Sequence, residues 1–250
     1  MSGRGPVPTS ENIFSFDTGH LQIELPRPDD APILFGLVGG EHRREVTVTL
    51  LWDGPDHISD IEEWIEKCSN KTFADYGFHW AVRDKTGEFT GRAGEAMGAI
   101  GTRPRGEPGR ADVGYWLGRP YWGKGIMGEA LTELLELGFI TLDYYKMEAD
   151  IYTSNARGLR LVESAGMIRE GVVRRAYRKN GEWVDATIYG ILKEEWQAKE
   201  SRPVDTPPVE NRLTQMIPGT EPPIADQQPG PLSWRSTVLR PPSPSLPSQQ

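Results

Sequence analysis

The stretch VGYWLGRPYWGKGIMGEAL, from Val113 to Leu131, decides how the rest of the chain is interpreted. It joins an aromatic, strand-like segment to a helical pattern through a turn that contains Gly123, Lys124 and Gly125. The first backbone N–H groups of a helix lack partners and carry a partial positive charge, and glycines leave those groups open to an anion. The stretch therefore predicts a pyrophosphate site, although the same glycines also fit a sharp turn without a ligand.

The stretch also nearly matches a nucleoside-triphosphate loop. Gly118, Gly123 and Lys124 fit the spacing G-x-x-x-x-G-K, but Gly125 stands where Ser or Thr should hold Mg²⁺. Asp150, the carboxylate of a later strand-like segment, lies inside the strand pattern and not at its end. The sequence therefore does not favour an ATP or GTP site.

Composition divides the chain of 250 residues into three parts. Residues 201–250 contain 12 of the 21 prolines and one aromatic residue, too little apolar surface to offset chain entropy. We therefore expect a disordered Pro-rich tail over residues 197–250 and a flexible segment over residues 1–19. Residues 20–196 remain for one domain with a hydrophobic core.

Charge and cysteine usage restrict the class of protein further. The formal net charge of −8 argues against nucleic acid or an anionic membrane as a partner. No apolar run approaches the ~20 residues of a membrane span, and no signal segment follows Met1, so we expect a cytoplasmic protein. The single Cys68 shares a helical face with Ile61 and Ile65, which predicts a core residue. The four histidines have no metal-ligand spacing, and we expect no metal.

The order of predicted elements describes an α/β sandwich with a long mixed sheet. Alternating apolar residues predict strands over 20–25, 78–84, 96–102, 111–117 and 146–152, and a β-branched run predicts a strand or extended segment over 46–52. Helical spacing predicts helices over 27–38, 59–68, 124–143 and 156–166. Ser59 and Glu62 predict a capping box for the second helix. A final hairpin over 167–192 turns at Asn180 and Gly181.

Three segments in a fixed order resemble the GNAT acetyltransferase superfamily: GYWLGRPYWGKGIMGEAL, YTSNARGLRLVESAGM and REGVVRRAYRKNGEWVDATIYGIL. The likeness is closest to its RimJ/RimL-like branch, which acetylates the N-termini of ribosomal proteins, and VTVTLLWDGPDHISDIEEWI also resembles that branch. The resemblance covers residues 20–196. It implies a GNAT-like mixed central sheet of about seven strands with helices on both faces, acetyl-CoA as cosubstrate and a primary amine as acceptor.

The resemblance also implies which residues contact acetyl-CoA. The family's pyrophosphate signature is Arg or Gln, two residues, Gly, one residue, and Gly or Ala; Gly125 matches it, whereas Trp122 and Met127 depart from it. Asn155 matches the asparagine that contacts the pantetheine arm, and a splayed strand pairs with this arm. The implied cofactor residues are Tyr115, Trp116, Leu117, Trp122, Gly123, Lys124, Gly125, Ile126, Met127, Gly128 and Asn155.

Direct attack of the amine on the thioester requires no side-chain nucleophile. The amine must lose a proton, and a carboxylate is the usual acceptor, so Asp112 and Glu95 at the starts of two strands are the candidate bases. The departing thiolate needs a proton, for which Ser154 and Tyr152 are the candidates. These assignments describe a catalytic acetyltransferase.

Departures from the family pattern leave an alternative open. Some members place a tyrosine that acts as a general acid after a leucine, but this chain has Val162 after Leu161. The pyrophosphate signature is also altered. A non-catalytic CoA-binding or regulatory module of the same fold would also fit. As an enzyme, the chain would act as a monomer or homodimer on the amine of a protein N-terminus or a small molecule.

Overall fold

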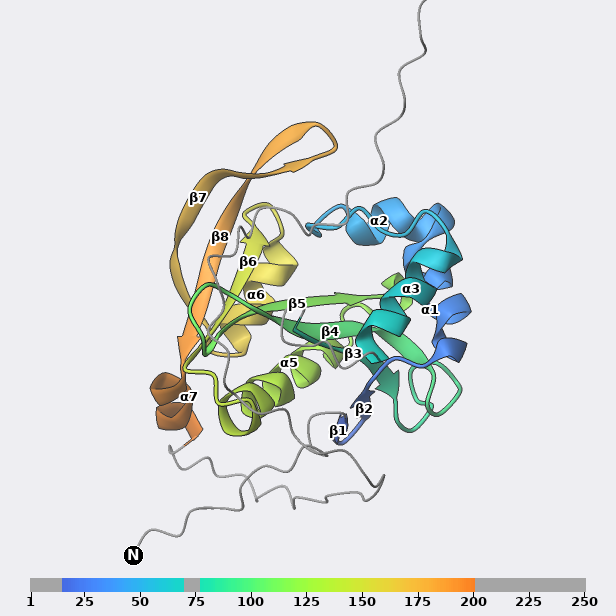
Figure 1. Ribbon diagram of the computed structural model, residues 1–250, viewed down its shortest axis with the longest axis horizontal. Coiled ribbons are helices and arrows are strands. Elements are labelled where there is room, and N and C mark those ends of the chain that lie inside the picture. The colour runs from blue at the N-terminus through green and yellow to red at the C-terminus, as the bar shows by residue number, and fades with distance from the viewer. Residues whose placement is uncertain (1–14, 70–76, 201–250) are drawn as a thin grey trace, which may run out of the picture. The chain divides into compact units, whose positions relative to one another are not determined.

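The computed structural model describes residues 15–69 and 77–200. One sheet of eight strands lies at the centre of this part of the chain, in the order β1-β2-β3-β4-β5-β6-β8-β7 (Figure 1). Neighbouring strands are antiparallel except β5 and β6, which are parallel. The strands are β1 Ser15–Asp17, β2 Leu21–Glu24, β3 Phe78–Asp84, β4 Ala96–Pro104, β5 Arg110–Leu117, β6 Lys146–Tyr152, β7 Ile168–Lys179 and β8 Glu182–Leu192.

Helices pack on both faces of this sheet (Figure 1). The helices of one face are α1 Ala31–Val38, α2 Arg43–Thr47 and α3 Ile58–Ser69, and we call this side the α1 face. The helices of the other are α5 Ile126–Glu136, which continues as a π-helical turn over Leu137–Thr141, and α6 Ala156–Ser164; we call this side the α5 face. A further helix, α7 Lys193–Glu200, follows β8.

Each face has its own hydrophobic core because successive strand residues point to opposite sides of the sheet. Trp80, Leu131 and Val162 belong to the cluster on the α5 face. Leu34 and Ile65 belong to the cluster on the α1 face. The mixed α/β sheet with helices on both faces, predicted from the sequence, is therefore confirmed.

Cys68 is a core residue, as predicted. Its side chain is buried on α3, and burial raises the pKa of the thiol to about 12. A thiol with so high a pKa is not a nucleophile at neutral pH. The structure thus agrees with a reaction that uses no cysteine.

The prediction for residues 46–52 is wrong. Val46 and Thr47 end α2, and turns follow in place of a strand. Val46 is instead buried with Leu34 of α1 and Ile65 of α3 in the hydrophobic cluster of the α1 face. Tertiary context therefore overrides the local preference of these residues.

Helix and strand ends differ from the prediction in two further places. Helix α3 begins at Ile58, and Asp60, not Glu62, accepts the backbone N–H of His57 at 2.9 Å, so the proposed pair with Ser59 does not form the cap. Strand β1 lies in the segment predicted to be flexible and pairs with β2. The hairpin turn at Asn180 and Gly181 is as predicted, with φ of 50° and 84°.

Two buried charges fix the N-terminal half of the sheet. Arg83 is 1% exposed and binds Asp30 at the start of α1 with N–O distances of 2.7 and 2.5 Å, and it also contacts Glu24. Asp84 is fully buried and accepts backbone N–H groups from the following loop, including those of Gly87 and Thr90 at 2.8 Å. These carboxylates are structural because they are held by partners of the fold itself.

Candidate active site

Strands β5 and β6 separate after a short paired segment. Their registered pairs are Arg110 with Lys146, Ala111 with Met147, and Asp112 with Glu148. Beyond this point β5 stays paired with β4 as far as Leu117, and β6 stays paired with β8 as far as Tyr152. The two strands therefore diverge between residues 113–117 and 149–152, and we call this opening the wedge. Its deep end is at the last pair, Asp112 with Glu148, and its open end is at Leu117 and Tyr152.

The backbone of β5 presents hydrogen-bonding groups to the wedge. At the two ends of the β4–β5 ladder, Gly118 N–H donates to Met97 at 2.9 Å and Arg105 N–H donates to Arg110 at 3.0 Å. Along a strand of an antiparallel pair, every second residue directs its N–H and C=O groups to the partner strand. The residues of β5 that bond β4 therefore alternate with residues whose N–H and C=O groups point toward β6. The β5 residues whose backbone faces the wedge are Val113, Tyr115 and Leu117.

This geometry divides the three strand residues that were predicted to contact the pantetheine arm. Tyr115 and Leu117 present their backbone groups to the wedge. Trp116 does not, because it lies opposite Ala99 in a pair that bonds β4. Its indole packs on the α1 face, where its ring centroid lies 6.4 Å from that of Trp52.

The predicted glycine turn lies at the open end of the wedge, between β5 and α5. Gly123 and Gly125 have φ of 75° and 81°, a left-handed conformation that side chains disfavour. Gly125 is the N-cap of α5, and a Cβ at either glycine would meet no atom within 4 Å. The turn thus needs its glycines for backbone conformation, and the space outside it is open.

The start of α5 has free backbone donors. The N–H groups of Gly128 and Glu129 bond the Gly125 carbonyl at 2.9 and 3.1 Å. Those of Ile126 and Met127 have no acceptor within the described ranges, 15–69 and 77–200. The Met127 side chain is 8% exposed and packs into the core of the α5 face, so its bulk does not cover these donors.

Trp122, which departs from the family signature, anchors the open end of the wedge. Its indole N–H donates to the Leu117 carbonyl at 2.6 Å. The guanidinium groups of Arg119 and Arg157 lie 4.9 and 4.4 Å from its ring centroid. Trp122 therefore connects the end of β5 to the first turn of α6. Lys124 points to the rings of nearby aromatic residues, with its Nζ 5.9 Å from the Tyr121 centroid.

The end of β6 carries the other predicted residues. Asn155 is the N-cap of α6, and its side-chain oxygen accepts the Gly158 N–H at 3.0 Å. Ser154 lies exposed in the turn before it, past the end of β6 at the open end of the wedge. Tyr152 donates its hydroxyl to the Leu50 carbonyl at 3.1 Å and so holds the segment after α2. Neither hydroxyl lies at the deep end of the wedge.

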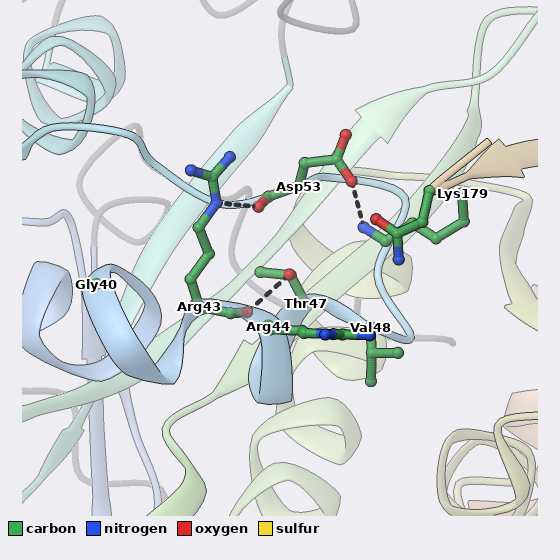
Figure 2. Close-up of a pocket in the computed structure, with 8 residues that line it drawn as sticks. Gly40, Arg43, Arg44, Thr47, Val48, Asp53 and Lys179 are labelled. Atoms are coloured by element: carbon green, nitrogen blue, oxygen red, sulfur yellow. Dashed lines mark hydrogen bonds and ion pairs between the residues drawn. The ribbon is translucent and has the colours of Figure 1, made fainter.

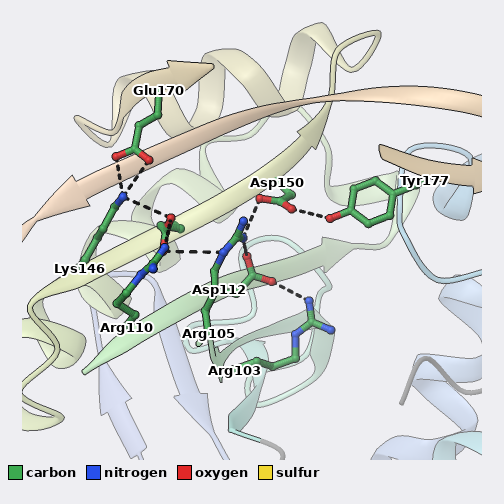
Figure 3. A network of polar contacts seen from close by, with 9 residues as sticks. Arg103, Arg105, Arg110, Asp112, Lys146, Asp150, Glu170 and Tyr177 are labelled. Carbon is green, nitrogen blue, oxygen red and sulfur yellow. Dashed lines mark hydrogen bonds and ion pairs between the residues drawn. The ribbon is translucent and has the colours of Figure 1, made fainter. Parts of the chain in front are cut away.

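Asp112 lies at the deep end, in a polar network (Figure 3). It accepts hydrogen bonds from Arg103 at 2.7 Å and Arg105 at 2.9 Å, and Arg105 also bonds Asp150 at 2.7 Å. The Tyr177 hydroxyl donates to Asp150 at 2.5 Å. Burial raises the pKa of Asp112 above its ordinary value, and the two guanidinium groups only partly oppose this effect.

The partners of Asp112 were not predicted from the sequence. The spacing of Arg103 and Arg105, two residues apart in a strand-like pattern, was the available signal that both face one side. The contribution of Asp150 depends on the parallel register of β5 and β6, and that of Tyr177 on the path of β7. Neither can be read from local spacing.

The two candidate bases do not lie together. Strand β4 runs antiparallel to β5, with Gly98 opposite Leu117 and Arg103 opposite Asp112. Glu95 precedes β4 and therefore lies beyond the open end of the wedge. Glu95 instead lies 3.6 Å from Arg92 in the loop between β3 and β4. Glu95 therefore does not lie at the deep end of the wedge, where Asp112 is.

A hollow of about 420 Å³ lies between α2 and the β7–β8 turn (Figure 2). Arg43 donates to the Asp53 carbonyl at 2.6 Å, and Lys179 bonds the Asp53 carboxylate at 2.6 Å. The Arg44 side chain has no polar partner in the described part of the chain. The residues that line the hollow are Gly40, Arg43, Arg44, Thr47, Val48, Asp53, Lys179 and Asn180.

Neither a metal site nor a membrane span is found in residues 15–69 and 77–200. No group of three or more His, Cys, Asp or Glu side chains is arranged there to hold a metal ion. None of the helices described there has the length and apolar character needed to cross a bilayer.

The wedge, the glycine turn and the free helix start leave open backbone groups between two parallel strands of an α/β protein. The family model described as "Acetyltransferase (GNAT) domain" matches residues 20–168. The chain therefore belongs to the GNAT acetyltransferase family and is an acyltransferase, as predicted from the sequence. Members of this family use acetyl-CoA as the acetyl donor.

A curated relative agrees with this assignment. The uncharacterized N-acetyltransferase p20 of Bacillus licheniformis is 36% identical over 90 residues, which cover 36% of this chain and 51% of that relative. The chain thus aligns with about half the length of this curated relative.

Two solved structures share the fold. Ribosomal-protein-S5-alanine acetyltransferase of Vibrio fischeri has a TM-score of 0.59 and 20% identity, covering 73% of this chain and 98% of that one. Spermidine N-acetyltransferase of Vibrio cholerae, solved with CoA and spermine, has a TM-score of 0.61 and 16% identity, covering 72% and 99%. At these identities the two structures show a shared fold.

Proposed function

We propose that this chain transfers the acetyl group of acetyl-CoA to a primary amine, which attacks the thioester directly. The observation that carries the proposal is the wedge: β5 and β6 part after three residue pairs and leave backbone donors and acceptors of β5 without a strand partner. A pantetheine arm carries amide groups and resembles an extended peptide, so it can pair with such an edge.

The residues around the wedge fit each part of acetyl-CoA. The N–H groups of Ile126 and Met127 at the start of α5 would bind the pyrophosphate, with Lys124 as a nearby cation. The backbone of Tyr115 and the N–H group of Leu117 would bind the arm, since the Leu117 carbonyl already accepts the Trp122 indole N–H. From Val113 to Leu117 this edge is about 14 Å long at ~3.4 Å per residue, so it can hold an extended chain.

The deep end of the wedge would hold the thioester. Acetyl-CoA supplies an acetyl group already activated by its sulfur leaving group. The backbone N–H groups of Val113 and Tyr115 face the wedge, and one of them would donate to the carbonyl oxygen as negative charge develops. Ser154 lies at the open end, a position that suits contact with the polar part of the cofactor better than proton transfer to the sulfur.

Asp112 is the base that we propose for the amine proton. It lies next to the point where β5 and β6 separate, on the α1 face, and burial brings its pKa closer to neutrality. A carboxylate with a raised pKa accepts a proton more readily at neutral pH. Arg105 and Arg103 hold both carboxylate oxygens in place, so transfer through a bridging water also fits this arrangement.

The amine would approach from the α1 face, where the hollow beside α2 opens toward the β7–β8 turn (Figure 2). A primary amine at a protein N-terminus or on a small molecule fits the chemistry. Among proteins of the same fold, one is named for a ribosomal-protein alanine and one for spermidine. These names define the first acceptors to test.

The test is an acetylation assay with purified chain, acetyl-CoA and a panel of ribosomal-protein N-terminal peptides, polyamines and amino acids. Free CoA thiol and the mass of each acceptor are measured together. An acetylated acceptor formed at least tenfold faster than without protein supports the proposal. Tight CoA binding with no product across the whole panel would replace it with the non-catalytic module.

A further inference from the structure

Gly114 is exposed to solvent although it lies in the middle of β5, a central strand of the sheet. Its neighbour Val113 is 5% exposed and belongs to the core of the α5 face. Side chains alternate along a strand, so a Cβ at Gly114 would point to the α1 face, as the side chains of Asp112 and Trp116 do. Solvent therefore reaches the sheet itself at Gly114, between a carboxylate and an indole.

The fold does not require a glycine at this position. Gly114 does not have a positive φ, and a Cβ placed on it would meet no atom within 4 Å. The glycines of β4 differ, because a Cβ at Gly101 would collide with the His79 ring and one at Gly98 would collide with the Trp116 carbonyl. Gly98 and Gly101 are thus needed for packing, whereas Gly114 leaves open space.

The space over Gly114 lies beside the groups of the proposed reaction. Asp112 precedes Gly114 by two residues, about 7 Å along the strand on the same face. Across the wedge, Asp150 and Gly114 are each two residues beyond the last registered pair, and the Asp150 carboxylate bonds Arg105 and Tyr177. A glycine inside a strand often marks a place where a ligand approaches the backbone closely.

We propose that Gly114 forms the floor of the acceptor site, so that the primary amine lies over its Cα on the α1 face, between Asp112 and Trp116. This inference rests on the proposed function, because it requires the thioester to lie at the deep end of the wedge. The amine nitrogen bonds the carbonyl carbon and gives a proton to Asp112, directly or through water. The carbon–sulfur bond breaks, and the sulfur leaves with the electron pair. A side chain at position 114 would occupy the volume that the amine needs.

Gly114→Ala and Gly114→Val fill this space without a clash inside the fold. Replacing a strand glycine by alanine restricts the unfolded chain, so the melting temperature of Gly114→Ala should be unchanged or higher. The backbone groups that face the wedge belong to neighbouring residues, so CoA affinity should equal that of the wild type. Gly171→Ala is the matched control, because Gly171 also lies on a strand, has no positive φ and would place its Cβ in open space.

The experiment compares two quantities in the wild type and the three variants. One is kcat/KM for the acceptor that the wild type acetylates fastest, and the other is the dissociation constant of CoA measured by calorimetry. A displacement of about 1 Å at the reacting atoms can lower a rate roughly 10²-fold, so Gly114→Ala should lower kcat/KM more than about tenfold and Gly114→Val more than about 10²-fold. Gly171→Ala should match the wild type in both quantities.

The outcomes separate this inference from the function on which it rests. No acetylation by the wild type across the acceptor panel would overturn the proposed function and the inference with it. Wild-type kcat/KM in Gly114→Ala would overturn only the role of Gly114. Equal losses of kcat/KM and CoA affinity would also overturn it, because Gly114 would then belong to the cofactor site. A Gly114→Ala protein that does not fold would reject the inference, because the fold itself would then need the glycine; Gly114→Ala decides the question whether or not Gly114→Val folds.

Discussion

Gly125→Val tests the glycine turn as the pyrophosphate site. Gly125 is the N-cap of α5 with φ of 81°, and a Cβ there would meet no protein atom within 4 Å. The substitution therefore causes no clash inside the fold. It does place a β-branched side chain in the left-handed region, at a cost of about 1–2 kcal/mol in unfolding free energy or somewhat more.

The effect on the cofactor should be larger than the effect on the fold. A side chain at the N-cap occupies the open space outside the turn and hinders approach to the N–H groups of Ile126 and Met127. Loss of these two charge-assisted hydrogen bonds should weaken CoA binding by more than tenfold, since each is worth about 1.5–3 kcal/mol. Calorimetry with CoA measures this affinity directly.

Gly181→Val is the matched control for this variant. Gly181 also has a left-handed φ, 84°, a Cβ added to it would meet no atom within 4 Å, and it lies in the β7–β8 turn. Both variants should lose similar unfolding free energy in urea titrations, but only Gly125→Val should lose CoA affinity. Wild-type affinity in a folded Gly125→Val protein would remove the turn from the binding site.

Three further perturbations test the fold and the base. Arg83→Leu should lower the unfolding free energy by about 3–5 kcal/mol in urea titrations, because it leaves the buried Asp30 without its counter-charge, whereas Glu24 keeps its ion pair with Arg27. Burial tends to raise the pKa of Asp84, but hydrogen bonds from backbone N–H groups outweigh burial and lower the pKa below 3.8. The Asp84 carboxylate therefore stabilises the fold fully above pH 3.8, and this stabilisation is lost as the pH falls through the lower pKa of the folded state. Asp84→Asn should therefore melt well below wild type at pH 7, and the gap should shrink in acid; a constant gap would contradict this reasoning. Asp112→Asn should lower kcat roughly 10²–10⁴-fold and abolish the acid limb of the pH–rate profile, which in the wild type should lie above pH 3.8 because the pKa is raised. Wild-type rates with an unchanged acid limb would exclude Asp112 as the base.

The sequence predicted those features that depend on local backbone chemistry. Gly125 has the left-handed φ expected of a turn glycine, and Asn180 with Gly181 closes the predicted hairpin. Cys68 is in the core because helical spacing places it beside Ile61 and Ile65. Each of these conclusions needs only the residues within about one helical turn or one hairpin.

The features that the sequence did not predict depend on strand register and on packing between distant elements. The segment 46–52 has strand-like composition, but its Val46 is buried between residues of α1 and α3. Arg105 bonds both Asp112 and Asp150 only because the neighbouring strands bring the three residues to the same end of β5. Alternation along β5 predicts that the side chains of Tyr115 and Asp112 point to opposite faces of the sheet. It does not predict which face each side chain takes.

The orientation of the β5 side chains gives the proposed reaction a direction through the sheet. Asp112 and Trp116 point to the α1 face, where the hollow lies, whereas Val113 and Tyr115 point to the α5 face. An amine that enters from the α1 face would meet the base on its own side of the sheet. The backbone N–H groups in the plane of the sheet would hold the carbonyl oxygen between them.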